Sequence, residues 1–370
     1  MGNLSVLPIF TKAAFLWLVI FFLFGCQGKS GWTGKPHYDG DEFKNVHLYE
    51  ENTFRDLIKW RWDALFKEIP GPEAYDFPMA ENNPDFLKEN KQQPTLTWIG
   101  HATLLLQVSG KNILTDPVFS DRASPFQWAG PKRVVPPGMK ISELPSIDMV
   151  LISHDHYDAL NEPSILELFK RPAGERTTFY VPLGLKEWFN KRGITRVVEM
   201  DWWDRSVNEE LILTAVPVQH WSKRAVFSKN QTLWSGWVLE SPDFKFIFVG
   251  DSGYCPHFKE IGKRFKNFDL AAIPIGAYEP RWFMGKHHMN PEESVKVHQD
   301  LRSKKSVAIH WGTFILTDEP LDEPPKRLKK ALRNADLDED EFMVLRHGET
   351  IMPESPDESE SIQKITSGLR

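Results

Sequence analysis

The chain has 370 residues, of which 41% are hydrophobic and 26% are charged, and its formal net charge at pH 7 is −6. This length and hydrophobic content predict a globular protein with a large buried core. Nucleic-acid binding calls for a basic surface, and the net negative charge argues against one. We therefore expect no nucleic-acid partner.

The first 25 residues have the pattern of a lipoprotein signal peptide. Lys12 precedes an unbroken apolar run over 13–24, which has the length of a signal-peptide h-region and is short for a bilayer span. The run ends in Leu23-Phe24-Gly25-Cys26, which resembles a bacterial lipobox with Cys26 as the lipidated residue. Phe24 is untypical at its position, and an uncleaved signal anchor is the alternative. Either way, we expect a protein of the bacterial cell envelope, held at the membrane outside the cytoplasm by its N-terminus.

The rest of the chain divides into three parts. Residues 26–90 are expected to form a tether, rich in Gly and Lys over 27–40, followed by a wrapping segment with a helix over 54–67. Residues 91–352 form the main predicted domain, and the polar tail 353–370 is expected to be disordered.

Apolar runs and stretches of helical spacing alternate through the main domain. Strands are predicted at 96–99, 103–108, 112–115, 149–152, 178–181, 197–200, 211–218, 233–239, 244–249, 270–275, 306–309 and 342–345, and helices at 164–170, 185–191, 291–301 and 326–332. Two sheets with helices outside, an α/β sandwich, is the simplest packing of this order.

A short loop after one buried strand carries the strongest chemical signal in the sequence. The apolar residues 149–152 predict a strand buried on both faces, and His154, His156 and Asp158 follow it at alternate positions. A loop that leaves the end of a buried strand is held rigidly at its root, so its side chains can converge on one point. Imidazole nitrogen with carboxylate oxygen is a ligand mixture that zinc accepts, and the alternative is a polar loop with two solvated histidines.

Three more polar residues occupy the same place relative to a strand. His220 follows the strand predicted at 211–218, Asp251 follows the one at 244–249, and His310 follows the one at 306–309. A lone histidine after a strand is more often hydrogen-bonded than a ligand, but three such residues together with the metal loop reverse that expectation. Because strand ends at one edge of a sandwich are neighbours in space, these loops predict one concave metal site.

The run His154-Asp155-His156-Tyr157-Asp158 resembles the metal loop of the metallo-β-lactamase superfamily, whose fold is a four-layered αββα sandwich. Longer stretches resemble one branch of it, the N-acylphosphatidylethanolamine-hydrolysing phospholipase D family. The motifs that carry this resemblance lie at 98–103, 114–117, 131–133, 219–221, 250–254, 273–284 and 308–314. The resemblance implies the fold class α/β, with this sandwich forming a hydrolase domain in residues 91–352.

The resemblance also implies a pair of zinc ions. The ligands would be His154, His156 and His220 for the first ion and Asp158 and His310 for the second, with Asp251 bridging the two. Asp251 would also orient the attacking hydroxide, and His288 would have a catalytic role beside it. Asp116 would lie behind the ligands and support them.

The sequence departs from the family pattern at one ligand. The family has a histidine directly after the loop aspartate, as a ligand of the second metal, and here that position is Ala159. A methyl group cannot bind zinc, so the second site has one ligand fewer and is expected to hold its ion more weakly. Water or Asn161 is the candidate to fill the gap.

The activity that the resemblance implies is hydrolysis of a phospholipid by D-type cleavage. In the run 273–284, Arg281 is expected to meet the phosphate, and Trp282 and Tyr278 are expected to contact the lipid. Two alternatives stay open: a lactone or sugar-phosphate hydrolase on the same fold, and a non-catalytic lipoprotein whose metal site has decayed. The sequence leaves the oligomeric state open, including a homo-oligomer.

Overall fold

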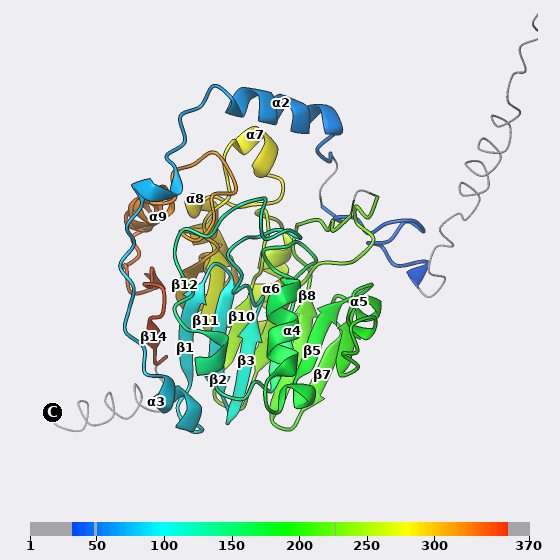
Figure 1. The fold of residues 1–370 in the computed structure, drawn as a ribbon, viewed down its shortest axis with the longest axis vertical. Helices are drawn as coiled ribbons and strands as arrows, with labels where there is room; N and C mark the ends of the chain where they lie inside the picture. The colour runs from blue at the N-terminus through cyan, green and yellow to red at the C-terminus, as the bar shows by residue number, and fades with distance from the viewer. Residues whose placement is uncertain (1–31, 48–49, 226, 354–370) are drawn as a thin grey trace, which may run out of the picture.

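The computed structural model describes residues 32–47, 50–225 and 227–353 (Figure 1). The predicted signal peptide, Cys26 and the polar tail beyond residue 353 lie outside these residues. In the described part of the chain, no helix combines the length and the apolar character needed to cross a membrane.

The first of two sheets contains the metal loop and has the strand order β14-β1-β2-β3-β4-β5-β6. Its strands are β1 (Thr95–Gly100), β2 (Thr103–Val108), β3 (Lys111–Thr115), β4 (Met149–Leu151), β5 (Thr178–Pro182), β6 (Val197–Met200) and β14 (Thr350–Ile351). Strands β14, β1, β2 and β3 pair antiparallel, whereas β3, β4, β5 and β6 pair in parallel. The carboxyl ends of the parallel strands therefore meet at one edge, and the metal loop leaves β4 there.

The second sheet has the order β13-β12-β11-β10-β9-β8-β7 and the same division into two halves. Its strands are β7 (Arg205–Asn208), β8 (Leu211–Val216), β9 (Gly236–Glu240), β10 (Lys245–Phe248), β11 (Phe268–Pro274), β12 (Ser303–Ile309) and β13 (Phe342–Met343). Strands β10 to β13 are parallel, and β7 to β10 are antiparallel. Asp251 follows β10 and His310 follows β12, so both lie at the carboxyl ends of parallel strands.

Helices cover the outer face of each sheet, so the predicted four-layered αββα sandwich is confirmed (Figure 1). The helices are α4 (Glu162–Lys170) and α5 (Lys186–Asn190) on the first sheet, and α6 (His257–Phe265), α8 (Pro291–Leu301) and α9 (Glu323–Asn334) on the second. Leu104 and Leu106 of β2 pack in the core shared with the second sheet, whereas Leu105 packs with Leu168 of α4. Successive side chains of a strand point to opposite faces, so one strand contributes to both cores.

Segments before the first sheet pack on this sandwich. Helix α2 (Phe54–Ala64) lies at the top of Figure 1 beside the short helix α7 (Arg281–Met284). The remaining short helices are α3 (Pro84–Glu89), η2 (Pro72–Ala74), η3 (Ile141–Glu143) and η4 (Gly174–Arg176).

The predicted tether is wrong for residues 32–40. Tyr38 and Phe43 are buried in the core, and His37 Nε2 lies 2.8 Å from Asp201 Oδ1. Trp32 packs against the rings of Tyr38 and Phe43. These aromatic side chains give the segment an apolar surface, which a flexible tether lacks, so the segment folds onto the domain.

Sequence patterns missed three α-helices (α3, α6 and α7), two strands (β7 and β14) and the three short 3-10 helices η2, η3 and η4. Strand β7 lies at the edge of its sheet with exposed or half-buried side chains, so it has no apolar run to reveal it. The strand predicted at 233–239 begins only at Gly236. Leu233 and Ser235 donate their backbone N–H groups to the carbonyls of Leu183 and Ser153 in neighbouring loops, so they do not join the ladder.

The two sheets approach closely where β10 ends beside the metal loop. Gly250 has a φ of +66°, and a Cβ added there would lie 2.7 Å from the Cβ of Ser153. Glycine adopts this left-handed conformation at little cost and leaves room for the neighbouring loop. The residue therefore permits the approach that brings Asp251 beside His154.

We predict that Gly250→Ala lowers the free energy of unfolding by about 2–5 kcal/mol, because the left-handed backbone and the overpacking against Ser153 both cost stability. Gly193→Ala is the matched control, since Gly193 has a φ of +78° but nothing within 4 Å of its added Cβ. Denaturant unfolding of the metal-free proteins measures both changes. Equal losses in the two variants would contradict the contact with Ser153 as the cause.

Candidate metal centre

The predicted ligands converge at the edge where the parallel strands of both sheets end. The metal loop lies between β4 and α4 and carries three of them, while the others follow strands of the second sheet. These side chains are all buried or half-buried: His154, His156, Asp158, His220, Asp251 and His310. Their origin in four separate loops means that the whole sandwich must form before the site exists.

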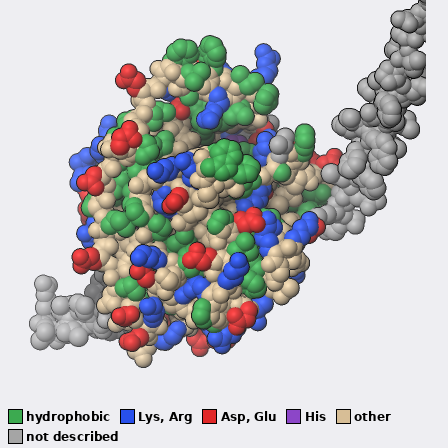
Figure 2. Space-filling model, in the orientation of Figure 1, with side chains coloured by type: hydrophobic (Ala, Val, Ile, Leu, Met, Phe, Trp, Pro, Cys, Tyr) green, Lys and Arg blue, Asp and Glu red, His purple; other side chains and the backbone are tan. Residues whose placement is uncertain are grey.

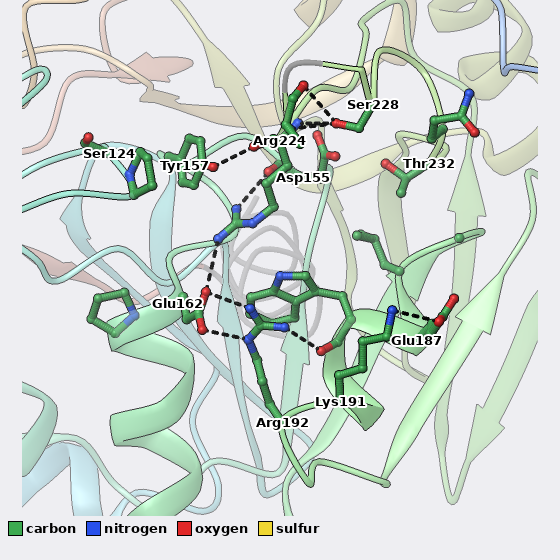
Figure 3. Close-up of a pocket in the computed structure, with 17 residues that line it drawn as sticks. Ser124, Asp155, Tyr157, Glu162, Glu187, Lys191, Arg192, Arg224, Ser228 and Thr232 are labelled. Atoms are coloured by element: carbon green, nitrogen blue, oxygen red, sulfur yellow. Dashed lines mark hydrogen bonds and ion pairs between the residues drawn. The ribbon is translucent and has the colours of Figure 1, made fainter. Parts of the chain in front are cut away.

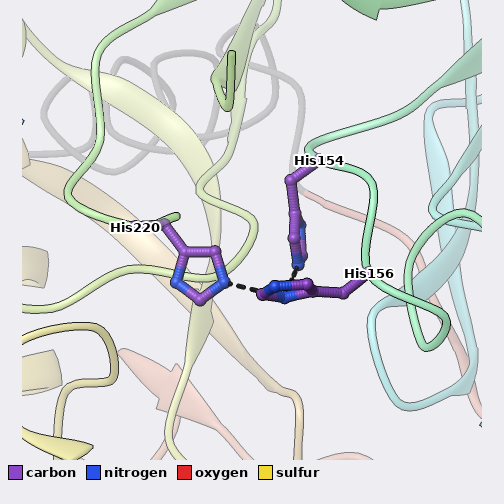
Figure 4. Close-up of side chains that lie close together, drawn as sticks. All are labelled: His154, His156 and His220. Carbon is purple, nitrogen blue, oxygen red and sulfur yellow. Dashed lines mark hydrogen bonds between the residues drawn. The ribbon is translucent and has the colours of Figure 1, made fainter. Parts of the chain in front are cut away.

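Three ring nitrogens meet in the first group of side chains (Figure 4). His156 Nδ1 lies 2.8 Å from His154 Nε2 and 3.3 Å from His220 Nε2. Lone pairs of neutral imidazoles that face one another repel, whereas a cation between the rings attracts all three. Nitrogen ligands at about 2.0–2.1 Å from a tetrahedral zinc ion are about 3.3 Å apart, so this arrangement fits a shared ion.

Hydrogen bonds fix which nitrogen of His154 faces the centre. Its Nδ1 lies 2.8 Å from Ser153 Oγ, and that hydroxyl donates to the carboxylate of Asp116. Asp116 Oδ1 also accepts a hydrogen bond of 2.7 Å from the backbone N–H of Ser153. The Nδ1–H of His154 therefore donates to the hydroxyl, and Nε2 keeps its lone pair for an ion. Asp116 therefore lies behind His154, one hydrogen bond further from the centre.

Two segments remote in sequence position His220. Its Nδ1 lies 3.0 Å from the backbone carbonyl of His287, which leaves Nε2 directed at His156. Asn45 holds the backbone of His220 on both sides: its Nδ2 donates to the carbonyl at 2.8 Å, and its Oδ1 accepts from the N–H at 3.1 Å. Sequence reasoning missed Asn45, because it lies in an N-terminal stretch with no motif.

Asp251 connects the first group to a second one. Its Oδ2 lies 3.6 Å from His154 Nε2, 3.8 Å from His220 Nε2 and 3.1 Å from His310 Nε2. His310 Nε2 is also 3.4 Å from Asp158 Oδ2. This buried nitrogen has no hydrogen bond of acceptable geometry to any described residue. Side chains that approach so closely without pointing at one another are arranged as ligands of a common ion.

His101 is a further member of the second group. Its Nε2 lies 3.1 Å from Asp158 Oδ2, and its ring centroid lies 4.0 Å from that of His310. It was not among the predicted site residues. Its only signal in the sequence was its place in the motif over 98–103, where it lies in the short turn between two strands.

Burial and local charge set protonation states that suit a cation. Burial lowers the pKa of His154 to about 4, so its ring is neutral at pH 7. Burial opposes ionisation of Asp251, but its histidine neighbours, His310 foremost, outweigh burial and hold its pKa well below the usual range. Burial also opposes charge on His310, but Asp251 and Asp158 outweigh it and raise its pKa to about 10. An ion bound between these groups takes the place of the His310 proton, so the donor set fits zinc.

His288 faces the same centre. Its ring centroid lies 5.1 Å from that of His220 and 5.4 Å from that of His310. Burial lowers its pKa to about 3, so the ring is neutral. The preceding residue, His287, has its Nε2 3.5 Å from the carboxylate of Glu51.

The expectation that Arg281 meets the substrate phosphate stays a prediction, and the structure gives this residue partners within the protein. Its guanidinium forms an ion pair of 2.8 Å with Glu293 and donates a hydrogen bond of 2.8 Å to the carbonyl of His288. Its charge is therefore balanced within the protein. The residue holds the segment that carries His288.

A cavity of about 420 Å³ opens onto the candidate ligands. Its polar end is formed by His156, Asp158, Asp251 and His288. Its apolar wall comes from α2, α7 and a later loop: Phe54, Leu57, Trp60, Phe283, Met284 and Leu316. The cavity therefore places a large apolar surface beside a cluster of metal-binding groups.

Two residues expected to contact a lipid lie outside this wall. Tyr278 is fully buried, and its hydroxyl donates a hydrogen bond of 2.7 Å to Glu323. Trp282 is half-exposed on α7, where the ammonium of Lys59 lies 4.4 Å from its ring centroid. The next two residues of the same run, Phe283 and Met284, line the cavity instead.

A second pocket, of about 540 Å³, lies behind the metal loop (Figure 3). Arg224 Nη1 donates to the carbonyls of Asp155 and Leu160, at 2.9 and 2.7 Å. The hydroxyl of Tyr157 donates to the carbonyl of Arg224 at 2.6 Å. These bonds hold both ends of the metal loop, so we interpret this region as the support that keeps the ligands in place.

We predict that Ser153→Ala weakens zinc binding by about 10–100-fold, because it removes the hydroxyl that orients His154. Competition with a chelator of known affinity measures the dissociation constant. Ser206→Ala, on the edge strand β7, is the control and should leave the constant unchanged. A Ser153→Ala protein that binds zinc as tightly as its parent would show that the hydroxyl does not set the orientation of the ligand.

Comparison with known proteins agrees with this geometry. A family model described as Beta-lactamase superfamily domain matches residues 111–311. The chain is 42% identical over 265 residues to N-acyl-phosphatidylethanolamine-hydrolyzing phospholipase D 1 of Caenorhabditis elegans, a match that covers 68% of this chain and 74% of that protein. It is 37% identical over 303 residues to an uncharacterized protein of Mycobacterium tuberculosis, covering 80% of this chain and 79% of that protein.

Solved structures share the fold at low sequence identity. The isothiocyanate hydrolase from Delia radicum gut bacteria has a TM-score of 0.58 and 20% identity, covering 70% of this chain and 99% of that one. Igni18, a metallo hydrolase from Ignicoccus hospitalis, has a TM-score of 0.54 and 19% identity, covering 71% of this chain and 99% of that one. Together with the site, these matches show that the chain is a metal-dependent hydrolase that belongs to the metallo-β-lactamase superfamily, as a relative of the N-acylphosphatidylethanolamine-hydrolysing phospholipases D.

Proposed function

We propose that this chain is a zinc-dependent phosphodiesterase that hydrolyses N-acylphosphatidylethanolamine-type phospholipids to phosphatidic acid and N-acylethanolamine. The observation that carries the proposal is the cavity that joins candidate metal ligands to an apolar wall. A phospholipid presents the same two chemistries, since its phosphodiester lies next to its acyl chains. The name of the Caenorhabditis elegans relative supports the same substrate class.

The side chains around the cavity supply distinct parts of this reaction. When bound, a pair of zinc ions supplies Lewis acidity and an activated water. Asp251 Oδ2 lies between the two ligand groups, where it would orient the attacking oxygen and accept its proton. The neutral ring of His288 can donate a hydrogen bond to a phosphoryl oxygen as negative charge builds there. Attack on phosphorus breaks its bond to the ethanolamide oxygen, which leaves with a proton.

Two lysines line this cavity, and Lys223 is the one that can meet the phosphate, because Lys229 lies 3.8 Å from the carboxylate of Glu51. The backbone N–H of Lys223 donates a hydrogen bond of 2.7 Å to Asp155 Oδ1, which fixes the residue beside the metal loop. No acidic side chain forms an ion pair with its ammonium in the described part of the chain. The ammonium would therefore be free to approach the phosphate of an entering lipid.

The outward face of α2 supports contact with a bilayer. Trp60 is buried on the inner face, whereas Ile58, Trp62, Leu65 and Phe66 are 54–76% exposed at the outer face or just beyond the helix. Figure 2 shows hydrophobic side chains gathered at the top of the molecule, over α2. An apolar surface of this kind is stabilised by entering the interfacial region of a membrane. Because α2 also lines the cavity, a lipid could pass from the bilayer toward the metal ligands along apolar surface.

The N-terminal pattern adds a tether to the same proposal. Lipidation of Cys26 would hold the domain at the membrane of the bacterial cell envelope, outside the cytoplasm. A tethered enzyme meets bilayer lipids at a high effective concentration, whereas a soluble sugar phosphate or lactone gains nothing from the tether. The tether and the α2 surface therefore favour the same class of substrate.

The first test is lipid hydrolysis by the purified, zinc-loaded protein. We expect it to convert N-acylphosphatidylethanolamine in mixed micelles to phosphatidic acid and N-acylethanolamine, both measured by mass spectrometry. Asp251→Asn should lower turnover by about 10²–10⁴-fold, because it removes the carboxylate that orients the attacking oxygen and takes its proton. Asp269→Asn is the control, since Asp269 pairs with Lys304 at the start of β11. A protein that leaves the lipid intact yet hydrolyses a lactone or soluble phosphodiester would refute the substrate assignment.

The second test concerns α2. We expect Trp62→Ser combined with Phe66→Ser to weaken binding to phospholipid vesicles at least about tenfold, since each buried aromatic ring contributes about 1.5–3 kcal/mol. The measurement is vesicle sedimentation of a chain beginning at residue 27, so that neither the apolar run nor Cys26 masks the effect. Val207→Ser on β7 removes an equally exposed apolar residue and is the control. Unchanged vesicle binding with a changed oligomeric state would assign this face to self-association instead.

A further inference from the structure

Ala159 leaves the second ligand group without the imidazole that the superfamily pattern provides, and the neighbouring polar residue does not replace it. Asn161 was the protein side chain expected to fill the gap. Its Oδ1 accepts hydrogen bonds from the N–H and Oγ of Ser164, at 3.2 and 2.6 Å, and so caps α4. Its Nδ2 donates a hydrogen bond of 2.7 Å to Ser120 Oγ. Both ends of the amide are therefore engaged away from the metal centre.

An imidazole from the other side of the site lies where this ligand is needed. His101, Asp158 and His310 each offer one ligand atom, and the three atoms lie within 4.8 Å of one another. His101 Nε2 is 3.1 Å from Asp158 Oδ2, and His310 Nε2 is 3.4 Å from the same oxygen. Two ligands of a tetrahedral zinc ion are about 3.3 Å apart, so both distances match neighbouring ligands.

The backbone of His101 is built to hold the ring at this place. The residue lies in the turn between β1 and β2 with a φ of +54°, a left-handed conformation that costs free energy for a residue other than glycine. Its N–H donates to Thr313 Oγ1 at 2.8 Å, and its carbonyl accepts from the N–H of His310 at 2.9 Å. The last bond joins the two histidines through the main chain, so their rings keep a fixed relation.

The environment of the ring also fits a ligand. The side chain of His101 is buried, and its Nδ1 has no hydrogen-bond partner among the described residues. Its Nε2 lies 3.1 Å from Asp158 Oδ2, so the nitrogen that can bind an ion faces the carboxylate that the metal loop supplies.

We propose that His101 is the imidazole ligand that completes the second metal site, with Asp158, Asp251 and His310, in place of the histidine that Ala159 replaces. The proposal rests on the two-zinc centre of the proposed function but not on its lipid substrate. It also revises the expectation of a weakened second site, because the full number of protein ligands is restored from the turn between β1 and β2.

Metal binding by the full-length chain tests this assignment without any lipid. Equilibrium dialysis of metal-free protein against buffered zinc, followed by elemental analysis, gives the number of ions and the affinity of each. We expect two ions in the parent, and a second ion held more than about 100-fold more weakly in His101→Ala, because loss of a direct ligand exceeds the loss of a supporting hydrogen bond. His298→Ala removes a buried imidazole far from the centre and should keep both ions.

Two further variants separate a ligand from a hydrogen-bond donor to Asp158. Glutamine can donate an N–H to this carboxylate but lacks the imidazole lone pair, so His101→Gln should lose the second ion as His101→Ala does. Adding Ala159→His to His101→Ala should restore the second ion, because it returns an imidazole from the loop position. Retention of the second ion in His101→Gln within about tenfold of the parent, or a parent that binds a single ion, would overturn the proposal. Failure of lipid hydrolysis in a parent that passes these tests would refute only the substrate assignment.

Discussion

The contacts of Asp251 Oδ2 with nitrogens of His154, His220 and His310, at 3.1–3.8 Å, are the constraint on which the rest of the structure depends. Burying a charged carboxylate costs several kcal/mol of free energy unless a cation compensates its charge. The imidazole lone pairs beside it can bind the same cation. Burial drives His154 to its neutral form, and the pKa of Asp251 stays low because histidines surround it. Ionised carboxylates, neutral rings such as that of His154, and a His310 proton that an ion can replace give this cluster the charge and donor set of a zinc site.

The sandwich holds this cluster where its two sheets meet. Strands of both sheets deliver the ligand loops to one edge, and the glycine at 250 allows the loops of β4 and β10 to touch. Arg224 holds the metal loop from behind, while Asn45 fixes His220 from the N-terminal segment. The same N-terminal segment continues into α2, whose inner face lines the cavity and whose outer face is apolar. The metal site therefore opens into the cavity, and the cavity is lined by the helix whose outer face is the proposed membrane surface.

The sequence predicts those features of the structure that depend on residues close together in the chain. The strand before His154 and the alternation of His154, His156 and Asp158 are local, so the metal loop and its neighbours at the ends of β10 and β12 could be found by inspection. His101 could not, because its role depends on a turn in a different part of the sheet and on a main-chain bond to His310. Local sequence also does not reveal that Glu293 and Glu323 engage Arg281 and Tyr278, the two residues that were expected to meet the substrate. The edge strand β7 was missed for a related reason, since its exposed side chains leave no apolar run.

In the proposed centre, two metal ions share the carboxylate of Asp251 at the junction of the sheets. Anomalous diffraction from zinc-loaded crystals, measured on both sides of the zinc absorption edge, tests it most directly. We expect two peaks about 3.5–4 Å apart, one among His154, His156 and His220 and the other beside Asp158 and His310. A single peak, or a second peak away from Asp251, would contradict it.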